Sequence, residues 1–238
     1  MSVPRELILS IDTSGPDAGL ALGAGGHVDA IRLPCSPRGQ ARTEDLASCT
    51  AALLSARKRS AAEITVIGAV VGPGSYTGLR SGLAFLRGLA FARSLPAVAV
   101  GSLELLAWRG AAPGEQVLVV WPAGSGRSIV AAYRRQHDDV ELLEQAQLAG
   151  DDAGPFPQAR NYAALLAAQP LGPDCGRIAR ASGLVLRETP AGGLEQLATL
   201  VECRARRGRA GRSAELLPVY VGQSTARPNR NRVAVSPE

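Results

Sequence analysis

The sequence predicts an α/β protein, and two observations carry that prediction. Three short apolar segments, joined by tight polar turns, fill the first 33 residues and indicate an antiparallel meander. Two helical patterns then alternate with two apolar segments that resemble buried strands. We expect the order β-β-β-α-β-α-β, with elements at residues 7–12, 19–23, 28–33, 43–58, 64–71, 79–93 and 97–100.

The first helix has charges at both ends that suit its dipole. Acidic Glu44 and Asp45 lie in its first turn, and the basic residues 57–59 lie in its last turn. Its apolar face holds Leu46, Cys49, Leu53 and Leu54.

This element order is that of a ribonuclease-H-like half domain, the unit of the actin, sugar-kinase and Hsp70 fold. The second half gives a weaker signal. We expect strands at 116–121 and 129–134, a loop at 150–157, a helix at 161–169 and a helix that begins after Gly192 and Gly193.

The composition excludes several classes of protein. No apolar run reaches the roughly 18 residues of a membrane span, and the N-terminal run is too short for a signal peptide, so we expect a cytoplasmic protein. The four cysteines form no C-x-x-C pair. With only two histidines, His27 and His137, a metal site, a Ser-His-Asp hydrolase and any other catalytic set are not expected.

The net charge is +5, and nearly all of the positive charge is arginine. One interpretation of the arginine-rich segment 204–212 and of the tail arginines is a phosphate-contacting patch on an RNA-handling protein. The other is a set of solvated surface arginines, since no aromatic residues interleave them.

The segment GPGSYTG, residues 72–78, lies between an expected buried strand and a helix. Its glycines and the helix N-terminus can bind a phosphate, with Gly74 and Ser75 as candidate residues. It lacks the lysine of a Walker A loop and the spacing of a Rossmann motif. The alternative is a tight corner in which Ser75 or Thr77 caps the helix.

Asp12 and Thr13 follow the first strand, where an acid and hydroxyls meet the magnesium and phosphates of a nucleotide in actin-like enzymes. An aspartate at a strand end is also a common turn former. Weak binding of ATP or ADP at Asp12, Thr13, Gly74 and Ser75 therefore remains one of two interpretations.

The helix at 79–93 is apolar on most sides. One stripe holds Leu79, Leu83, Leu86 and Ala90, a second holds Phe85, Leu89 and Ala92, and Gly78, Gly82 and Gly88 leave room for another backbone. Such a helix must be covered on most sides, either within the chain or by another chain.

Three segments resemble the TsaB (YeaZ) family: ILSIDTSGPDAGLAL at 8–22, VVGPGSYTGLRSGLAFLRGLA at 70–90 and LPAVAVGSLELLA at 95–107. A fourth, LPVYV at 217–221, resembles the closing strand of that family. The resemblance covers the first 110 residues or so and is thin afterwards.

The resemblance implies an actin-like (ASKHA) fold of two ribonuclease-H-like lobes. We expect an N-terminal lobe at 1–105, a C-terminal lobe at 106–224 and a disordered tail at 225–238. It also implies a non-catalytic subunit without a required cofactor. Its partners would be the catalytic subunit TsaD, the ATPase TsaE and, through the complex, tRNA whose adenosine 37 receives threonylcarbamoyl.

The family's partner surface is formed by the two N-terminal helices. Carried over to this sequence, the contact residues are Leu46, Cys49, Leu53, Leu79, Leu83, Phe85, Leu86 and Ala90. The same face could support a homodimer when the partner is missing.

The sequence departs from the family pattern in two places. The first helix has Thr43 where relatives keep a histidine, and it lacks the H-x-x-x-H metal motif of TsaD-like enzymes. Near residue 121, Trp121 to Gly124 replace an Asp-Ala-Arg motif. The alternatives to a scaffold are a kinase or ATPase of the same fold, a peptidase, for which no nucleophile, base or metal set is present, and a free-standing RNA-binding module.

Overall fold

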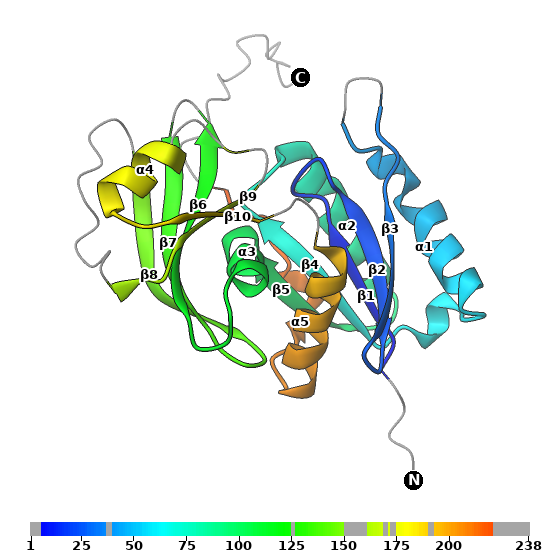
Figure 1. The fold of residues 1–238 in the computed structure, drawn as a ribbon. Helices are drawn as coiled ribbons and strands as arrows, with labels where there is room; N and C mark the ends of the chain where they lie inside the picture. Colours follow the sequence, from blue (N-terminus) through cyan, green and yellow to red (C-terminus); the bar gives the residue numbers. More distant parts are fainter. Residues whose placement is uncertain are drawn as a thin grey trace, which may run out of the picture.

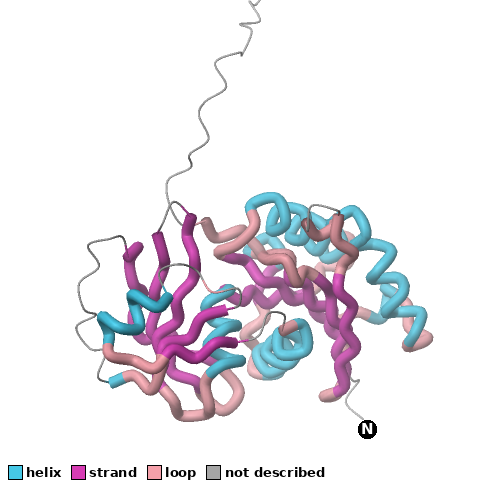
Figure 2. Tube along the Cα trace, turned by 45° about the horizontal axis from the view of Figure 1, so that its top comes forward, coloured by secondary structure: helices cyan, strands magenta, loops and turns pink. Residues whose placement is uncertain are grey.

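The computed structural model describes residues 6–36, 40–124, 127–149, 161–168, 171, 175–189 and 193–220. Two sheets lie with helices between them and on their outer faces (Figure 1). We call the sheet of β1–β5 and its outer helices lobe I, and the sheet of β6–β10 and its outer helix lobe II. The tube view in Figure 2 shows the two groups of strands separated by helices.

Lobe I contains a six-stranded sheet in the order β11-β5-β4-β1-β2-β3. Strands β1, β2 and β3 form an antiparallel meander, and β4 and β5 run parallel to β1. This is the predicted order of elements. The strands are β1 Ile8–Asp12, β2 Gly19–Ala24, β3 His27–Arg32, β4 Val66–Gly72, β5 Pro96–Gly101 and β11 Gly211–Arg212.

Two helices cover the outer face of this sheet, α1 (Leu46–Ala56) and α2 (Tyr76–Phe91). Alternate residues of β1 point to opposite faces, so Leu9 and Ile11 meet these helices while Ile8 faces the middle of the molecule. The helix α2 begins at the predicted cap, because the backbone N–H of Gly78 donates to Ser75 Oγ over 3.2 Å.

Lobe II repeats the strand order of the lobe I meander and its parallel strands. Its five-stranded sheet has the order β10-β9-β6-β7-β8, with β6–β8 antiparallel and β9 and β10 parallel to β6. Its elements are β6 Gln116–Gly124, β7 Arg127–Arg135, β8 Val140–Ala149, β9 Leu165–Ala168, α4 Cys175–Ser182 and β10 Leu186–Thr189. The predicted fold class, an actin-like pair of ribonuclease-H-like lobes, is confirmed.

One predicted element of lobe II is wrong. The helix expected at 161–169 is replaced by strand β9, which is hydrogen-bonded between β6 and β10. Its sequence, LLAA, has a high helix propensity, but both faces are buried in the sheet, and tertiary pairing overrides that preference.

The two lobes exchange helices. Helix α3 (Ser102–Gly110) follows the last parallel strand of lobe I but packs on the sheet of lobe II, and α5 (Leu194–Arg206) follows lobe II but packs on β1, β2 and β4. Figure 1 shows both helices between the sheets. One hydrophobic core therefore joins residues of lobe I, α3, α5 and lobe II.

The division at residue 105 stays a prediction, and that residue lies inside α3. The expected loop at 150–157 and the tail at 225–238 fall outside the described residues. Residues 217–220, the described part of the segment that resembles a closing strand, do not form a strand. Val219 N–H nevertheless donates a hydrogen bond to Val71 O over 2.7 Å.

Candidate functional site

The side chains predicted to contact a partner belong to the chain's own core. Leu83 is 3% exposed and packs between α2 and the sheet of lobe I. Six more of the predicted contacts are also buried, and only Phe85 is partly exposed. The buried set is Leu46, Cys49, Leu53, Leu79, Leu83, Leu86 and Ala90. The prediction that these seven side chains contact a partner is therefore corrected. The apolar periodicity identified the face of each helix that packs on the chain's own sheet.

The glycines of α2 divide into two groups. A Cβ on Gly78 would lie 2.2 Å from Thr13 O, and one on Gly82 would lie 2.3 Å from Thr13 Oγ1. These two glycines let the helix approach the chain's own first loop. Gly88, in contrast, has no atom within 4 Å of an added Cβ, so it faces outward.

The exposed side chains of α1 and α2 include small residues, two arginines and, at the two ends of α2, the aromatic rings of Tyr76 and Phe91. Phe91, at the end of α2, is 88% exposed. We call the following exposed residues the outer helical face: Ala47, Ala51, Ala52, Arg80, Ala84, Arg87, Gly88 and Phe91. Sequence reasoning missed Phe91, although its spacing of seven residues from Ala84 places both on one helix face.

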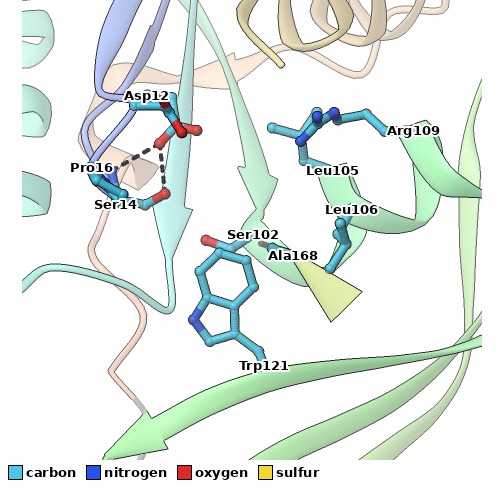
Figure 3. Close-up of a pocket in the computed structure, with 11 residues that line it drawn as sticks. Asp12, Ser14, Pro16, Ser102, Leu105, Leu106, Arg109, Trp121 and Ala168 are labelled. Carbon is cyan, nitrogen blue, oxygen red and sulfur yellow. Dashed lines mark hydrogen bonds between the residues drawn. The ribbon is translucent and has the colours of Figure 1, made fainter. Parts of the chain in front are cut away.

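A cavity of about 80 Å³ lies between the lobes, at the end of β1. Figure 3 shows Asp12 and Ser14 on one wall, with Arg109 and Trp121 across from them. Among the described residues of lobe II, Trp121 and Ala168 contribute to this lining. The charged and hydroxyl side chains that line the cavity thus come from lobe I and α3.

Asp12 is held in place by its own loop. Its Oδ1 accepts hydrogen bonds from Ser14 N over 2.8 Å and from Ser14 Oγ over 2.6 Å. Burial raises the pKa of Asp12 above 3.8, and the hydrogen bonds from Ser14 and the charge of Arg109 only partly oppose that rise. Burial also lowers the pKa of Arg109.

The other candidate phosphate residues lie elsewhere. Thr13 and Ser75 line an adjoining groove of about 420 Å³ beside the start of α2, which shares Ser14, Gly15 and Pro16 with the interlobe cavity. The N–H of Ser75 donates to Ser14 O over 2.7 Å, and Ser75 Oγ accepts from Gly78 N, so these two loop donors are already used. Gly74 lets the loops touch, since a Cβ there would lie 2.4 Å from Ser14 O. The geometry favours a tight corner at this position.

Trp121 occupies the position in lobe II that Asp12 occupies in lobe I. Ile11 is the last residue of β1 paired with β4, and Val120 is the last residue of β6 paired with β9. Asp12 and Trp121 are the residues that follow. The position that carries a carboxylate in lobe I therefore carries an indole in lobe II.

In the arginine-rich segment Arg204 is buried, whereas the side chains of Arg206, Arg207, Arg209 and Arg212 stay 40–86% exposed and are paired with carboxylates. Each of the five arginines lies within 4 Å of a carboxylate. The pairs are Arg204 with Asp139 and Glu104, Arg206 with Glu202, Arg207 with Asp138, Arg209 with Asp139, and Arg212 with Glu215.

Within the described residues, no three His, Cys, Asp or Glu side chains lie close enough together to bind a metal ion. The helices of the same residues are too short or too polar to span a bilayer.

Comparison with known proteins gives matches in both halves of the chain. A family model described as TsaD, tRNA N6-adenosine threonylcarbamoyltransferase, matches residues 37–154. The tRNA threonylcarbamoyladenosine biosynthesis protein TsaB of Escherichia coli K12 is 32% identical over 145 residues. That match covers 59% of this chain and 60% of the relative, so it spans less than two thirds of the relative's length.

Solved structures show the same fold over more of the chain. A Pseudomonas aeruginosa protein described as similar to peptidase YeaZ superimposes with a TM-score of 0.74 and 24% identity, covering 91% of this chain and 100% of that one. YeaZ from Pseudomonas aeruginosa gives a TM-score of 0.70 at 22% identity, with the same coverage. The predicted resemblance to the TsaB (YeaZ) family is confirmed.

Proposed function

We propose that this chain, a relative of the TsaB (YeaZ) family, is a non-catalytic subunit of the machinery that installs threonylcarbamoyl on N6 of adenosine 37 in tRNA. Its role is to bind the catalytic subunit TsaD and hold it in its active form. TsaE and tRNA join through the complex, and the chain itself requires no cofactor.

The observation that carries this proposal is the outer helical face. It combines small side chains, which allow another helix to approach closely, with the exposed ring of Phe91. Exposed aromatic residues on such a face are typical anchors of protein interfaces. No carboxylate is paired with Arg87 in the described residues, so the face favours a partner surface with acidic residues around an apolar pocket.

The alternative of an active kinase or ATPase of the same fold has less support. Pockets that hold drug-sized ligands have volumes of about 300 Å³ or more. The interlobe cavity at Asp12 has about 80 Å³, and its described wall on lobe II consists of Trp121 and Ala168. In the adjoining groove of about 420 Å³, the backbone N–H groups of Ser75 and Gly78 are already bonded within the chain. Magnesium-dependent ATP turnover by the isolated chain would establish the alternative.

The first experiment is co-purification of the chain with TsaD of the same organism, followed by size-exclusion chromatography with light scattering. We expect a one-to-one heterodimer. Two separate peaks at micromolar concentration would refute the pairing, and the chain alone would then be assayed for nucleotide binding. The same measurement without TsaD tells a homodimer from a monomer.

A matched pair of substitutions tests the face itself. Phe91→Ala removes the exposed ring, and we expect it to weaken TsaD binding about 30-fold without loss of stability. The control, Val185→Ala, removes an exposed apolar side chain of lobe II, which is 71% exposed, and should leave binding unchanged. Equal binding by both variants would place the contact on another surface.

A further inference from the structure

A buried ionic cluster lies beneath the turn between β7 and β8. Asp139 is fully buried, and its Oδ1 accepts hydrogen bonds from Arg204 Nε over 2.9 Å and from Arg204 Nη2 over 2.7 Å. Its Oδ2 accepts from Arg209 Nη1, and Arg204 Nη2 also donates to Glu104 Oε1. The carboxylate of Asp139 thus accepts hydrogen bonds from two guanidinium groups.

The members of this cluster come from separate parts of the molecule. Asp139 belongs to a hairpin of lobe II, Arg204 to α5 on the sheet of lobe I, and Glu104 to α3. Arg204 Nη1 also donates to Ala99 O, in β5 of lobe I, over 3.2 Å. Through Arg204, the lobe II turn is therefore bonded to the backbone of the lobe I sheet.

Two further contacts extend this link. Arg207, just after α5, pairs with Asp138 of the same turn over 2.7 Å. Arg135 places its Cζ 3.3 Å from the ring centroid of Trp108 in α3 and donates to the carbonyl oxygens of Trp108 and Asp139. The turn is thereby held on both sides.

Such bonds fix an orientation more strictly than apolar contact does. Packed apolar surfaces can slide by small steps, whereas a carboxylate that accepts four directed hydrogen bonds, as Asp139 does, has one arrangement. Burial alone would raise the pKa of Asp139, but hydrogen bonds from Arg204 and Val140 and the charges of Arg204 and Arg209 outweigh it and lower the pKa.

We propose that Asp139, Arg204, Glu104 and Arg209 form an interlobe lock. The lock holds the two lobes at one angle and keeps the cavity at Asp12 closed. Two lobes of one chain can move relative to one another, and here the cluster suppresses that motion by adding directed bonds to the hydrophobic core that the lobes share. The arginine-rich segment thereby serves the architecture of the chain.

The chain carries a reporter for this lock, because Trp121 lines the interlobe cavity. Its only other tryptophan is Trp108, and Trp108→Phe keeps an aromatic face for Arg135 while leaving one emitting indole. In that background, Asp139→Asn should at least double the acrylamide quenching of Trp121. We also expect a melting temperature about 10 °C lower, with unchanged far-ultraviolet circular dichroism.

The matched control is Glu141→Gln, in the same hairpin. It removes the ion pair of Arg134 and Glu141, which spans 2.9 Å, is exposed and stays within lobe II, so quenching should not change. A folded Asp139→Asn variant with unchanged quenching and an unchanged radius of gyration by X-ray scattering would overturn the proposal.

If Asp139→Asn fails to fold, Glu104→Gln decides the question. The side chain of Glu104 is 22% exposed, and glutamine can still accept the hydrogen bond from Gly101 N. Quenching should rise in this variant by less than in Asp139→Asn. No rise would equally overturn the lock.

Discussion

The two lobes share their strand order, but they differ in the residue that follows the paired part of their first strands. Strand β1 ends in Asp12, fixed by Ser14, whereas the matching position of β6 is Trp121. Lobe I also has two long outer helices with an exposed Phe91, whereas the described outer helix of lobe II is α4. One architecture thus supplies a polar loop and an exposed helical face in lobe I, and an aromatic side chain at the matching loop in lobe II.

The largest effects test whether these unequal lobes still unfold as one unit. Leu86→Ala, in the outer core of lobe I, should lower the free energy of unfolding by about 4 kcal/mol, and Ile178→Ala, in the outer core of lobe II, by about 3 kcal/mol. Because α3 and α5 are exchanged, both variants should show one cooperative transition in urea. Two separate transitions for Ile178→Ala would show that the lobes are independent.

An intermediate effect separates the inward glycines of α2 from the outward one. In Gly78→Ala the new Cβ meets Thr13 O, so we expect a loss of about 2 kcal/mol in unfolding free energy. Gly88→Ala has open space and a better helix propensity, so a gain of about 1 kcal/mol is expected. Chemical denaturation measures both, and a loss for Gly88→Ala would mean that this position is packed.

The smallest effect concerns Asp12. Because burial raises its pKa above 3.8 in the folded chain, its charge lowers stability at neutral pH, and this penalty disappears as the pH falls through the raised pKa toward 3.8. Asp12→Asn, which keeps acceptors for Ser14, should therefore be slightly more stable than the parent at pH 7 and equal to it near pH 3. A less stable variant at pH 7 would mean that the carboxylate is needed for the fold.

The fold of lobe I could be predicted because its signals are local. Tight turns separate β1, β2 and β3, Ser75 caps α2, and Pro96 follows the end of that helix. Lobe II depends on distant pairing: β9 has a helical sequence and becomes a strand only between β6 and β10. Periodicity cannot reveal such pairing.

The candidate site was harder to predict than the fold. Periodicity finds apolar stripes, but it cannot say which stripe meets the chain's own sheet, so Leu83 was expected to face a partner and Phe91 was overlooked. The arginine pairs were also hidden, because Arg204 and Asp139 are 65 residues apart in sequence. An ion pair between residues far apart in the sequence can be identified only once the fold shows that the two side chains lie together.

The exchange of α3 and α5 has a consequence for how the protein is made. The last parallel strand of the lobe I sheet ends at Gly101. The helix that covers the inner face of that sheet, α5, ends about 100 residues later, at Arg206. While the ribosome adds the intervening residues, Ile8, Val66 and Val98 lack that cover and present an apolar surface. The nascent chain therefore needs protection from aggregation until α5 has been translated, and a fragment that ends before α5 is not suited to expression alone.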